Sequence, residues 1–402
     1  MVKSDLYIQK IEKYVAHNYH PLPIVISRAK GCFVWDVDGN KYLDMLASYS
    51  ALNQGHCNRK VIKAAKKQLD KLTLTSRAFH NDLLGEFAEK LCKVSGFDMI
   101  LPMNSGAEAV ETALKLARKW GYDVKKVPLN TAEIIVCEGN FHGRTTTIVG
   151  FSSEKQYKQK FGPYAENAFK LIPYNNPQAL ENAITENTVA FLVEPIQGEG
   201  GIIIPDSGYL KAVYDICKKH NVLLLLDEIQ TGFGRTGKLF AYQHEEGVNP
   251  DILIMGKALS AGIMPISAIA ARKELMLLFI PGDHGSTFGG NPLACAVGLA
   301  ALDVIVKEKL VQKSKTLGEY FLKKLRTLQS RHIKKIRGKG LFIGIEIKTN
   351  SGKARPFCER LMKEGLLCKE THDQVIRLAP PLIITKKELD WAFERIKKVL
   401  CE

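Results

Sequence analysis

Apolar runs and amphipathic segments alternate along the chain from about residue 60. Four runs consist mainly of apolar residues without polar alternation, at 133–137, 189–193, 222–226 and 252–255. Strands buried on both faces of a parallel sheet show such continuous runs. Apolar residues at three- and four-residue spacing predict helices at 61–72, 82–93, 108–120 and 209–219. Strands that alternate with helices predict an α/β domain with a mostly parallel sheet.

The two ends of the chain carry different patterns. Near the N-terminus, Asp38-Gly39 lies between apolar runs and predicts a hairpin of strands at 33–36 and 41–44. After Asn291-Pro292, helical patterns at 293–308, 317–328, 357–364 and 386–400 accompany strand-like runs at 341–347 and 375–378. We therefore predict an N-terminal arm and hairpin (1–48) belonging to a small domain, a large α/β domain (49–299) and a C-terminal α+β domain (300–402).

The chain is basic, and the excess charge is concentrated near its end. Its 402 residues carry 57 Lys and Arg against 42 Asp and Glu, a net charge of +15. Residues 301–402 hold 24 basic and 12 acidic residues, which is +12 of that excess. This distribution raises the alternative of a nucleic-acid-binding surface, which would show steeply salt-dependent binding. The region lacks interleaved aromatic and basic residues, and its last helix has apolar residues at core spacing. A solvated domain surface is the interpretation we prefer, with no nucleic-acid and no membrane partner.

Cysteine and histidine usage indicates neither a disulfide framework nor a metal site. The nine Cys include no C-x-x-C pair, and the ten His show no metal-ligand spacing. The N-terminus has no apolar signal core. We expect free thiols, no bound metal and a cytoplasmic location.

An acid and a lysine stand at the ends of two predicted strands. Asp227 follows the run at 222–226, and Lys257 follows the run at 252–255 after one glycine. Ligands of parallel sheets gather beyond the carboxyl ends of the strands. Burial would lower the pKa of a lysine there and make its amine nucleophilic. Together the two residues match what pyridoxal 5'-phosphate (PLP) requires, although a surface lysine and a helix-capping acid remain the alternatives for each alone.

A second pattern predicts a phosphate site. Asn104-Ser105-Gly106-Ala107 opens the predicted helix at 108–120, and free N–H groups at a helix N-terminus bind phosphate. A serine cap without a ligand is the alternative. The glycine-rich stretch 284–291 is a flexible polar loop by its composition.

Several motifs together resemble one enzyme family. Asp227-Glu-Ile-Gln-Thr-Gly, Gly256-Lys-Ala-Leu and Gly285-Ser-Thr, in this order, resemble the class III (ω-) aminotransferases of PLP fold type I. The resemblance covers essentially the whole chain and is most specific for the branch that acts on ornithine, through segments 16–23, 48–56, 73–79, 118–122, 193–199 and 377–382. It implies an α/β fold of type I, with a mostly parallel central sheet and a smaller α+β domain.

The resemblance also implies how PLP would be bound. Lys257 would form the Schiff base and later move the proton, and Asp227 would pair with the pyridinium nitrogen. The remaining contacts would be Gln230 at the ring hydroxyl, Phe141 stacked on the ring, Ser105, Gly106 and Ala107 at the phosphate, and Thr287 reaching the phosphate from the partner subunit of a homodimer.

The implied reaction transfers the δ-amino group of L-ornithine to 2-oxoglutarate. It yields glutamate 5-semialdehyde, which cyclises to pyrroline-5-carboxylate, and glutamate. Tyr19 and Arg144 would bind the ornithine carboxylate, and Arg377 would bind the α-carboxylate of 2-oxoglutarate. Glu199 would pair with Arg377 in the first half-reaction and swing away in the second, while Tyr49 would favour ornithine over other amines.

Two enzymatic alternatives share the fold and the lysine. Another ω-aminotransferase would act on N-acetylornithine or 4-aminobutyrate, and Tyr19 and Tyr49 argue against it. A PLP aminomutase would need no external 2-oxo acid, and the presence of both Arg377 and Glu199 disfavours it. One departure from the family pattern concerns the gate, since the chain has Gly200 where the family often has alanine, and this glycine would loosen the gate.

Overall fold

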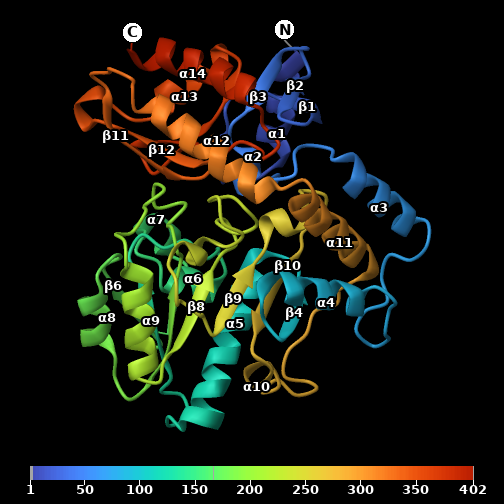
Figure 1. Cartoon of the computed structure of the whole chain (residues 1–402), viewed down its shortest axis with the longest axis vertical. Helices are drawn as coiled ribbons and strands as arrows, with labels where there is room; N and C mark the ends of the chain where they lie inside the picture. The colour runs from blue at the N-terminus through green and yellow to red at the C-terminus, as the bar shows by residue number, and fades with distance from the viewer. Residues whose placement is uncertain (1–2, 166, 402) are drawn as a thin grey trace.

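The computed structural model describes residues 3–165 and 167–401. Its larger part is built on a seven-stranded sheet that runs through the lower half of Figure 1. In spatial order the strands are β4 (Met99–Met103), β10 (Ser267–Ala271), β9 (Ile252–Met255), β8 (Leu223–Asp227), β7 (Thr188–Val193), β5 (Glu133–Cys137) and β6 (Phe169–Ile172).

Most neighbouring strands of this sheet are parallel, which confirms the predicted α/β class. The pairs β8–β9, β7–β8, β5–β7 and β5–β6 are parallel, and β10 alone runs antiparallel to both of its neighbours. The strands predicted at 133–137 and 252–255 have the observed bounds. β4 and β10 were not predicted, because Pro102 and the alanine-rich segment 267–271 lack a strand signal.

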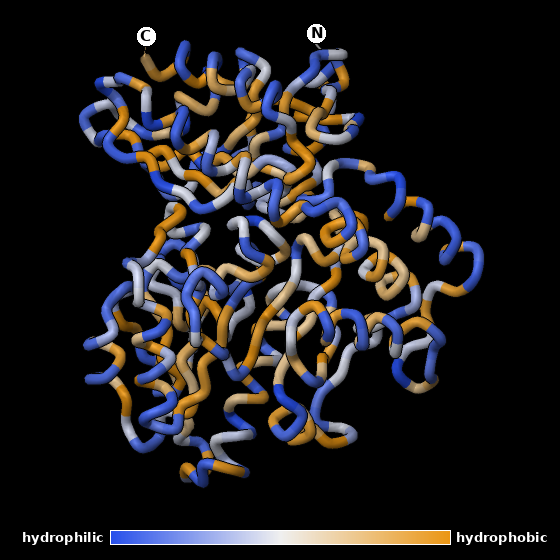
Figure 2. The backbone as a smooth tube through the Cα atoms, viewed as in Figure 1, coloured by the Kyte–Doolittle hydropathy of each residue, from blue (hydrophilic) through white to orange (hydrophobic). Residues whose placement is uncertain are grey.

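Helices cover both faces of the large sheet, and alternate strand residues enter two cores. In β8, Leu223 and Leu225 pack in a core with α5 (Gly106–Trp120). Leu224 and Leu226 pack in a second core that includes α9 (Tyr209–Lys219). Both faces of the strand are therefore buried, which explains its uninterrupted apolar sequence. Figure 2 shows the backbone of these strands largely in orange, the colour of hydrophobic residues.

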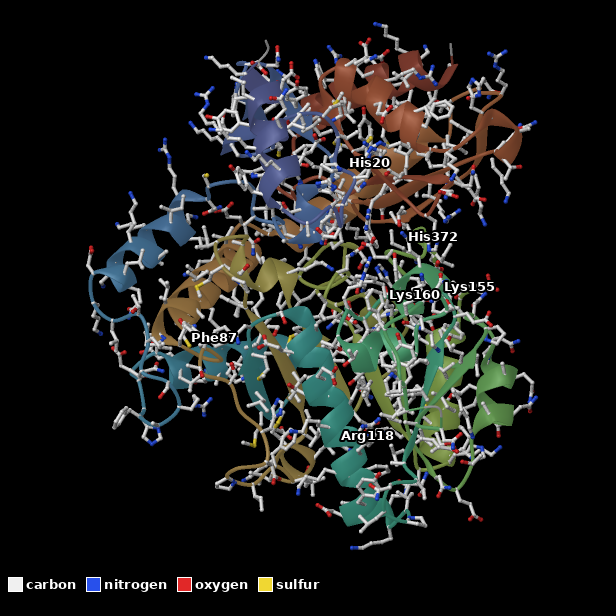
Figure 3. The ribbon with its side chains drawn as sticks, turned by 180° about the vertical axis from the view of Figure 1, so that it is seen from behind. His20, Phe87, Arg118, Lys155, Lys160 and His372 are labelled. Carbon is white, nitrogen blue, oxygen red and sulfur yellow. The ribbon has the colours of Figure 1, made fainter. Side chains whose placement is uncertain are left out.

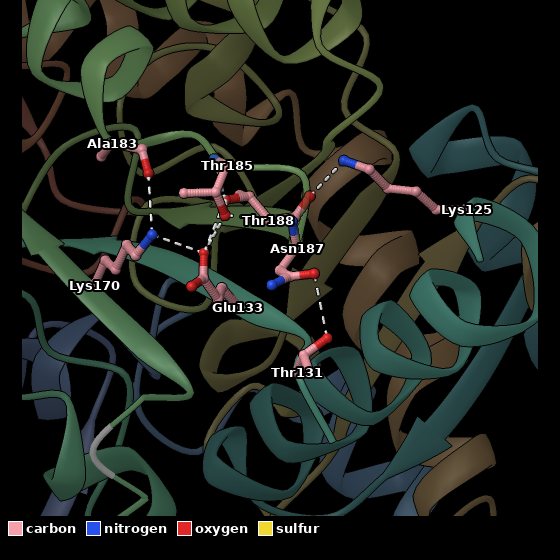
Figure 4. Close-up of polar contacts among 8 residues, drawn as sticks. All are labelled: Lys125, Thr131, Glu133, Lys170, Ala183, Thr185, Asn187 and Thr188. Atoms are coloured by element: carbon pink, nitrogen blue, oxygen red, sulfur yellow. Dashed lines mark hydrogen bonds and ion pairs between the residues drawn. The ribbon is translucent and has the colours of Figure 1, made fainter. Parts of the chain in front are cut away.

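Polar side chains organise the amino ends of three parallel strands (Figure 4). The Nζ of Lys170 donates to the carboxylate of Glu133 (2.7 Å), and Thr185 and Thr188 donate to the same oxygen. Lys125 donates to the carbonyl of Thr188 (2.6 Å). These contacts satisfy polar groups at the amino ends of the strands. Asp227 lies at the opposite, carboxyl ends, where parallel sheets bind their ligands.

The smaller part joins segments from both ends of the chain, as the blue and red elements at the top of Figure 1 show. One sheet contains β1 (Ile26–Lys30), β2 (Phe33–Asp36), β3 (Lys41–Asp44) and β13 (Leu366–Leu367), and β13 pairs with β3. The second sheet has the order β11 (Ile333–Lys339), β12 (Phe342–Ile347), β15 (Val375–Leu378) and β14 (Lys369–Thr371). The other elements of this part are α1 (Lys3–Tyr14), α12 (Leu310–Leu325), α13 (Arg355–Lys363) and α14 (Lys386–Cys401).

One long helix crosses the predicted boundary between residues 299 and 300. Helix α11 (Pro292–Lys307) packs against α3 (Arg59–Leu69) and α4 (Leu84–Ser95), which lie beside it in Figure 1. It begins at Asn291, whose side chain accepts the N–H of Ala294. The predicted division into three parts stays a prediction, and this helix would connect the two domains.

All nine cysteines of the chain are free thiols. Within residues 3–165 and 167–401, no cluster of His, Cys, Asp and Glu could hold a metal ion. No helix in the described part is long and apolar enough to cross a membrane.

Candidate active site

Asp227 and Lys257 lie side by side because β8 and β9 are parallel neighbours. Asp227 is the last residue of β8 and pairs with Ile254 of β9, three residues before Lys257. A cavity of about 210 Å³ opens at these strand ends. Its lining residues are Gly106, Ala107, Phe141, His142, Gly143, Glu194, Asp227, Ile229, Gln230, Thr231 and Lys257. Six of the eight residues proposed for the cofactor thus line one cavity.

The carboxylate of Asp227 is held in place by two hydrogen bonds. Nδ1 of His142 donates to Oδ2 (2.7 Å), and the backbone N–H of Ile229 donates to Oδ1 (3.0 Å). Burial alone would lower the pKa of His142, but its bond to Asp227 raises that pKa above the ordinary value. The two hydrogen bonds therefore fix the orientation of the Asp227 carboxylate at the floor of the cavity. No sequence signal pointed to His142, although it directly follows Phe141.

Lys257 has the properties of a nucleophilic amine. Burial lowers its pKa, and the nearby charge of Arg377 lowers it further, while Glu199 and Asp227 partly oppose this effect. Its backbone is left-handed (φ 42°), directly after the extended Gly256. The sharp turn brings the side chain back toward the strand ends instead of letting it follow a regular helix.

Glu194 is a buried acid that the sequence analysis did not single out. Its Oε1 accepts the N–H of Phe141 (2.9 Å), and its Oε2 accepts the N–H of Gly198 (3.0 Å). Burial is the main cause that raises its pKa to about 7, against the favourable charge of His142. One carboxylate thus connects the loop of Phe141 with the loop that carries Glu199.

The N-terminus of α5 forms a cradle for a small anion. Oγ of Ser105 accepts the N–H of Glu108 (3.2 Å), and the Glu108 carboxylate accepts the N–H of Ser105 (2.6 Å). In the described part of the chain, the N–H groups of Gly106 and Ala107 have no acceptor. A Cβ at Gly106 would lie 3.0 Å from Cδ1 of Ile229, so a larger residue here would have to displace that side chain. Free N–H groups and the helix dipole both favour a phosphate here.

The buried Arg377 forms an ion pair with Glu199, whose side chain is 24% exposed. Nη1 of Arg377 lies 2.5 Å from Oε1 of Glu199, and Nη2 lies 3.2 Å from Oε2. Gln230 joins them, because its amide donates to Glu199 (3.1 Å) and accepts from Arg377 (3.3 Å). Burial alone would raise the pKa of Glu199, but Arg377 outweighs it and lowers that pKa to about 2. Glu199 therefore stays ionised throughout the physiological range, and its role as a gate stays a prediction.

Gly200, where the family often has alanine, is tightly enclosed in this chain. A Cβ at this position would lie 3.0 Å from the carbonyl oxygen of Gly139 and 3.2 Å from Oε1 of Gln197. The glycine thus permits close packing of the loop that carries Glu199, in contrast to the expectation that it would loosen the gate.

The aromatic and basic residues proposed for the substrate lie around this pair. The Tyr49 ring is 4.7 Å from the Arg377 guanidinium, and mainly burial raises the pKa of Tyr49. Tyr19 is 77% exposed, yet it is close enough to influence the charge of Tyr49. The guanidinium of Arg144 stacks 3.8 Å above the ring of Tyr157, a contact that no sequence signal indicated.

Thr287 is exposed and does not line the cavity of its own chain.

Lys155 and Lys160 lie on the larger part and His372 on the smaller part, near the level at which the two parts meet (Figure 3). All three side chains are exposed. Basic groups at this level would attract anionic ligands.

The cavity fits the cofactor that the motifs implied. Free N–H groups suit a phosphate, the oriented carboxylate of Asp227 suits a protonated ring nitrogen, and a buried amine of lowered pKa suits a carbonyl. Phe141 supplies an aromatic face at the same cavity. No residue that lines the cavity obstructs this assignment.

Known proteins resemble this chain over its full length. A family model described as class III aminotransferase matches residues 14–400. The chain is 62% identical over 400 residues to the ornithine aminotransferase of Brevibacillus brevis, covering 100% of this chain and 99% of the relative. It is 60% identical over 398 residues to that of Bacillus subtilis, covering 99% and 98%.

Solved structures show the same fold. The crystal structure of the ornithine aminotransferase from Toxoplasma gondii superposes with a TM-score of 0.97 at 45% identity, covering 99% of this chain and 95% of that chain. The structure of an acetylornithine aminotransferase from Elizabethkingia anophelis superposes with a TM-score of 0.89 at 49% identity, covering 99% and 98%.

Proposed function

The chain belongs to the class III aminotransferase family, and we propose from this premise that it transfers the δ-amino group of L-ornithine to 2-oxoglutarate. The products are glutamate 5-semialdehyde, which cyclises to pyrroline-5-carboxylate, and glutamate. The observation that carries this proposal is the ion pair between the buried Arg377 and Glu199, next to the Tyr49 ring. It provides one site with two charge states, as two substrates of different charge require.

The family's cofactor is pyridoxal 5'-phosphate. When bound, it supplies an electron sink that stabilises negative charge on the substrate carbon next to the reacting nitrogen. Asp227 would hold the proton of the ring nitrogen, and His142 orients that carboxylate. Nζ of Lys257 would be the group that accepts and returns a proton beside the bound cofactor, a role for which its lowered pKa is suited.

The ion pair sorts the two substrates. With Glu199 on Arg377, the site presents no free cation beside the reacting δ-carbon, so ornithine places its carboxylate farther out, on Tyr19 and Arg144. When Glu199 moves away, Arg377 becomes free to bind the α-carboxylate of 2-oxoglutarate in a bidentate manner, and Arg144 binds the other carboxylate. Gln230 and Glu194, which both line the cavity, connect it to this gate: the Gln230 amide donates to Glu199, and Glu194 accepts the N–H of Gly198.

The first prediction tests the amine substrate against the closest alternative. In single turnover, ornithine should convert the bound cofactor with a kcat/KM at least about tenfold above that of N-acetylornithine or 4-aminobutyrate. N-acetylornithine carries an additional neutral acyl group, and 4-aminobutyrate lacks the α-ammonium. Stopped-flow absorbance of the cofactor measures each rate. Faster conversion of N-acetylornithine would reassign the substrate to that of the relative from E. anophelis.

The same preparation separates transamination from isomerisation. Glutamate should form only when 2-oxoglutarate is added, because the amino group must leave on a second substrate. Formation of a rearranged product without any 2-oxo acid would support an aminomutase instead.

We further propose a homodimer in which Thr287 binds the phosphate held by the partner subunit. Thr287 is exposed and does not line the cavity of its own chain. The phosphate at the N-terminus of α5 would be bound by N–H groups, so a hydroxyl from a second chain would add to those contacts. Removing one hydroxyl with Thr287→Val should raise the dissociation constant of the cofactor by about 10-fold, while Thr287→Ser should retain it. Cofactor titration followed by protein fluorescence measures this constant. Sedimentation of the holoenzyme as a monomer would contradict the proposal.

The free thiols support a cytoplasmic location, which stays a proposal.

A further inference from the structure

A left-handed turn stands directly beside the ion pair. The four residues of α2 (Ala47–Ser50) have φ angles of 49°, 47°, 59° and 73°, and none of them is glycine. The left-handed conformation is unfavourable for each L-residue with a side chain, and successive residues rarely share it. Such a run persists only where the surrounding structure imposes it.

One carboxylate fixes the entrance to the turn. Oδ1 of Asp44 accepts the N–H groups of both Leu46 (2.8 Å) and Ala47 (2.9 Å). Its Oδ2 is bonded to Nε2 of His56 (2.7 Å). The N–H of Leu52 closes the turn onto the carbonyl of Ala47 (3.1 Å).

The exit of the turn is tied to the segment of the reactive lysine. The amide of Gln54 donates to the carbonyl of Ala258, the residue after Lys257 (2.8 Å). Leu52 fills the space next to Gly262, where a Cβ would come within 2.4 Å of its Cδ2. The hydroxyl of Ser50 is buried with no hydrogen-bond partner in the described part of the chain. The chain thus adopts this turn although its backbone is strained and the Ser50 hydroxyl is left without a partner.

The turn determines where the Tyr49 side chain points. Tyr49 itself is left-handed (φ 59°, ψ 43°), and its ring lies 4.7 Å from the guanidinium of Arg377. A right-handed residue at this position would direct its Cβ differently, and the ring would leave Arg377. Mainly burial raises the pKa of Tyr49, which agrees with an enclosed ring.

We propose that the left-handed turn 47–50, locked by Asp44 and His56, is a positioning device that holds Tyr49 over Arg377 and thereby sets the selectivity among amine substrates. Asp44 and His56 are positioning residues, since they act through Tyr49 and line no part of the cavity. The selectivity part of this inference rests on the proposed function, whereas the strained turn itself does not.

Ser48 offers a matched pair of variants for the test. Its side chain is exposed and makes no hydrogen bond in the described part of the chain, so substitutions there act through the backbone. Ser48→Gly removes the left-handed penalty, whereas Ser48→Thr adds a β-branch that increases it. The holoenzyme of each variant is compared with the unmodified holoenzyme.

Three measurements are expected to separate the two variants. Ser48→Gly should keep the ratio of kcat/KM for ornithine to that for 4-aminobutyrate within about twofold and raise the melting temperature by about 1–2 °C. Ser48→Thr should lower this ratio about tenfold, with the rate of the 2-oxoglutarate half-reaction changed far less. Amide hydrogen exchange of the peptide spanning 46–52 should be faster in Ser48→Thr than in Ser48→Gly.

The outcomes decide between positioning and a merely structural role. Faster exchange in Ser48→Thr with an unchanged amine ratio would overturn the proposal, because the turn would then not control Tyr49. Equal exchange in both variants would show that the turn carries no strain, and would overturn it as well. If N-acetylornithine proves to be the preferred amine, the proposed function fails, yet the two variants still report on the turn through exchange and through the ratio of any two amines.

A second variant covers the case in which Ser48→Thr does not fold. Asp44→Asn keeps one oxygen for the N–H groups of Leu46 and Ala47, but its amide presents N–H groups or a neutral oxygen to His56. It should speed exchange at 46–52 and lower the amine ratio in the same direction. An unchanged exchange rate at 46–52 together with an unchanged amine ratio would contradict the role of the Asp44–His56 pair.

Discussion

Replacement of Lys257 by alanine is expected to slow transamination by at least about 10⁴-fold and to prevent covalent attachment of the cofactor. Its Nζ is the buried amine of lowered pKa at the strand ends, and it serves both as the attachment point and as the group that moves the proton. Asp227 and the N-terminus of α5 remain in this variant, so the cofactor should still bind without a covalent bond.

The measurement is mass spectrometry of the denatured protein after borohydride reduction, together with steady-state rates. The unmodified chain should gain the mass of the reduced cofactor, and the alanine variant should not. Lys257→Arg is the matched control for charge, because arginine keeps the cation but cannot supply a neutral amine, and it should be equally inactive. Attachment at another lysine in the alanine variant would refute the assignment.

Removal of Arg377 is expected to have the second-largest effect, and to affect one half-reaction. Arg377→Ala should lower kcat/KM for 2-oxoglutarate by about 10²–10³-fold, because two charge-assisted hydrogen bonds to the α-carboxylate are lost. It should also reduce the stability of the protein by about 1–3 kcal/mol, since the partly exposed Glu199 loses its cation and two hydrogen bonds. Conversion by ornithine should change far less.

Two further variants make this prediction specific. Arg377→Ala combined with Glu199→Gln should recover much of the lost stability, because no unpaired charge remains, but it should not recover the reaction with 2-oxoglutarate. Glu199→Gln alone should impair ornithine more than 2-oxoglutarate, since it leaves Arg377 free in both half-reactions. Half-reaction rates and urea unfolding of each holoenzyme measure the two effects. Equal loss in both half-reactions for Arg377→Ala would contradict a gate.

The position of the site could be predicted from local patterns. Continuous apolar runs indicated buried parallel strands, and residues that follow such strands meet at one edge of a sheet. Asp227 and Lys257 were therefore expected together, and the structure places them on neighbouring strands. Likewise, Ser105-Gly106 before an amphipathic segment predicted a helix N-terminus, and the observed capping box begins there.

Residues that act through long-range contacts could not be predicted in this way. His142 meets Asp227 across 85 positions, and Glu194 meets Phe141 across 53, and neither distance leaves a periodic signal. The helical pattern at 293–308 already indicated that one helix spans the predicted domain boundary, whereas its packing against α3 and α4 could be seen only in the structure.

The sequence by itself determined the α/β class, the strand-end acid and lysine, and the family to which the chain belongs, because hydrophobic periodicity and short motifs are local properties. The resemblance already implied the pairing of Glu199 with Arg377, and the structure shows that pair. Only the tertiary structure decided that Tyr49 reaches it from a left-handed turn. Local preference opposes four left-handed residues in succession. Their conformation follows from contacts with Asp44 and the segment after Lys257, which exist only once the chain has folded.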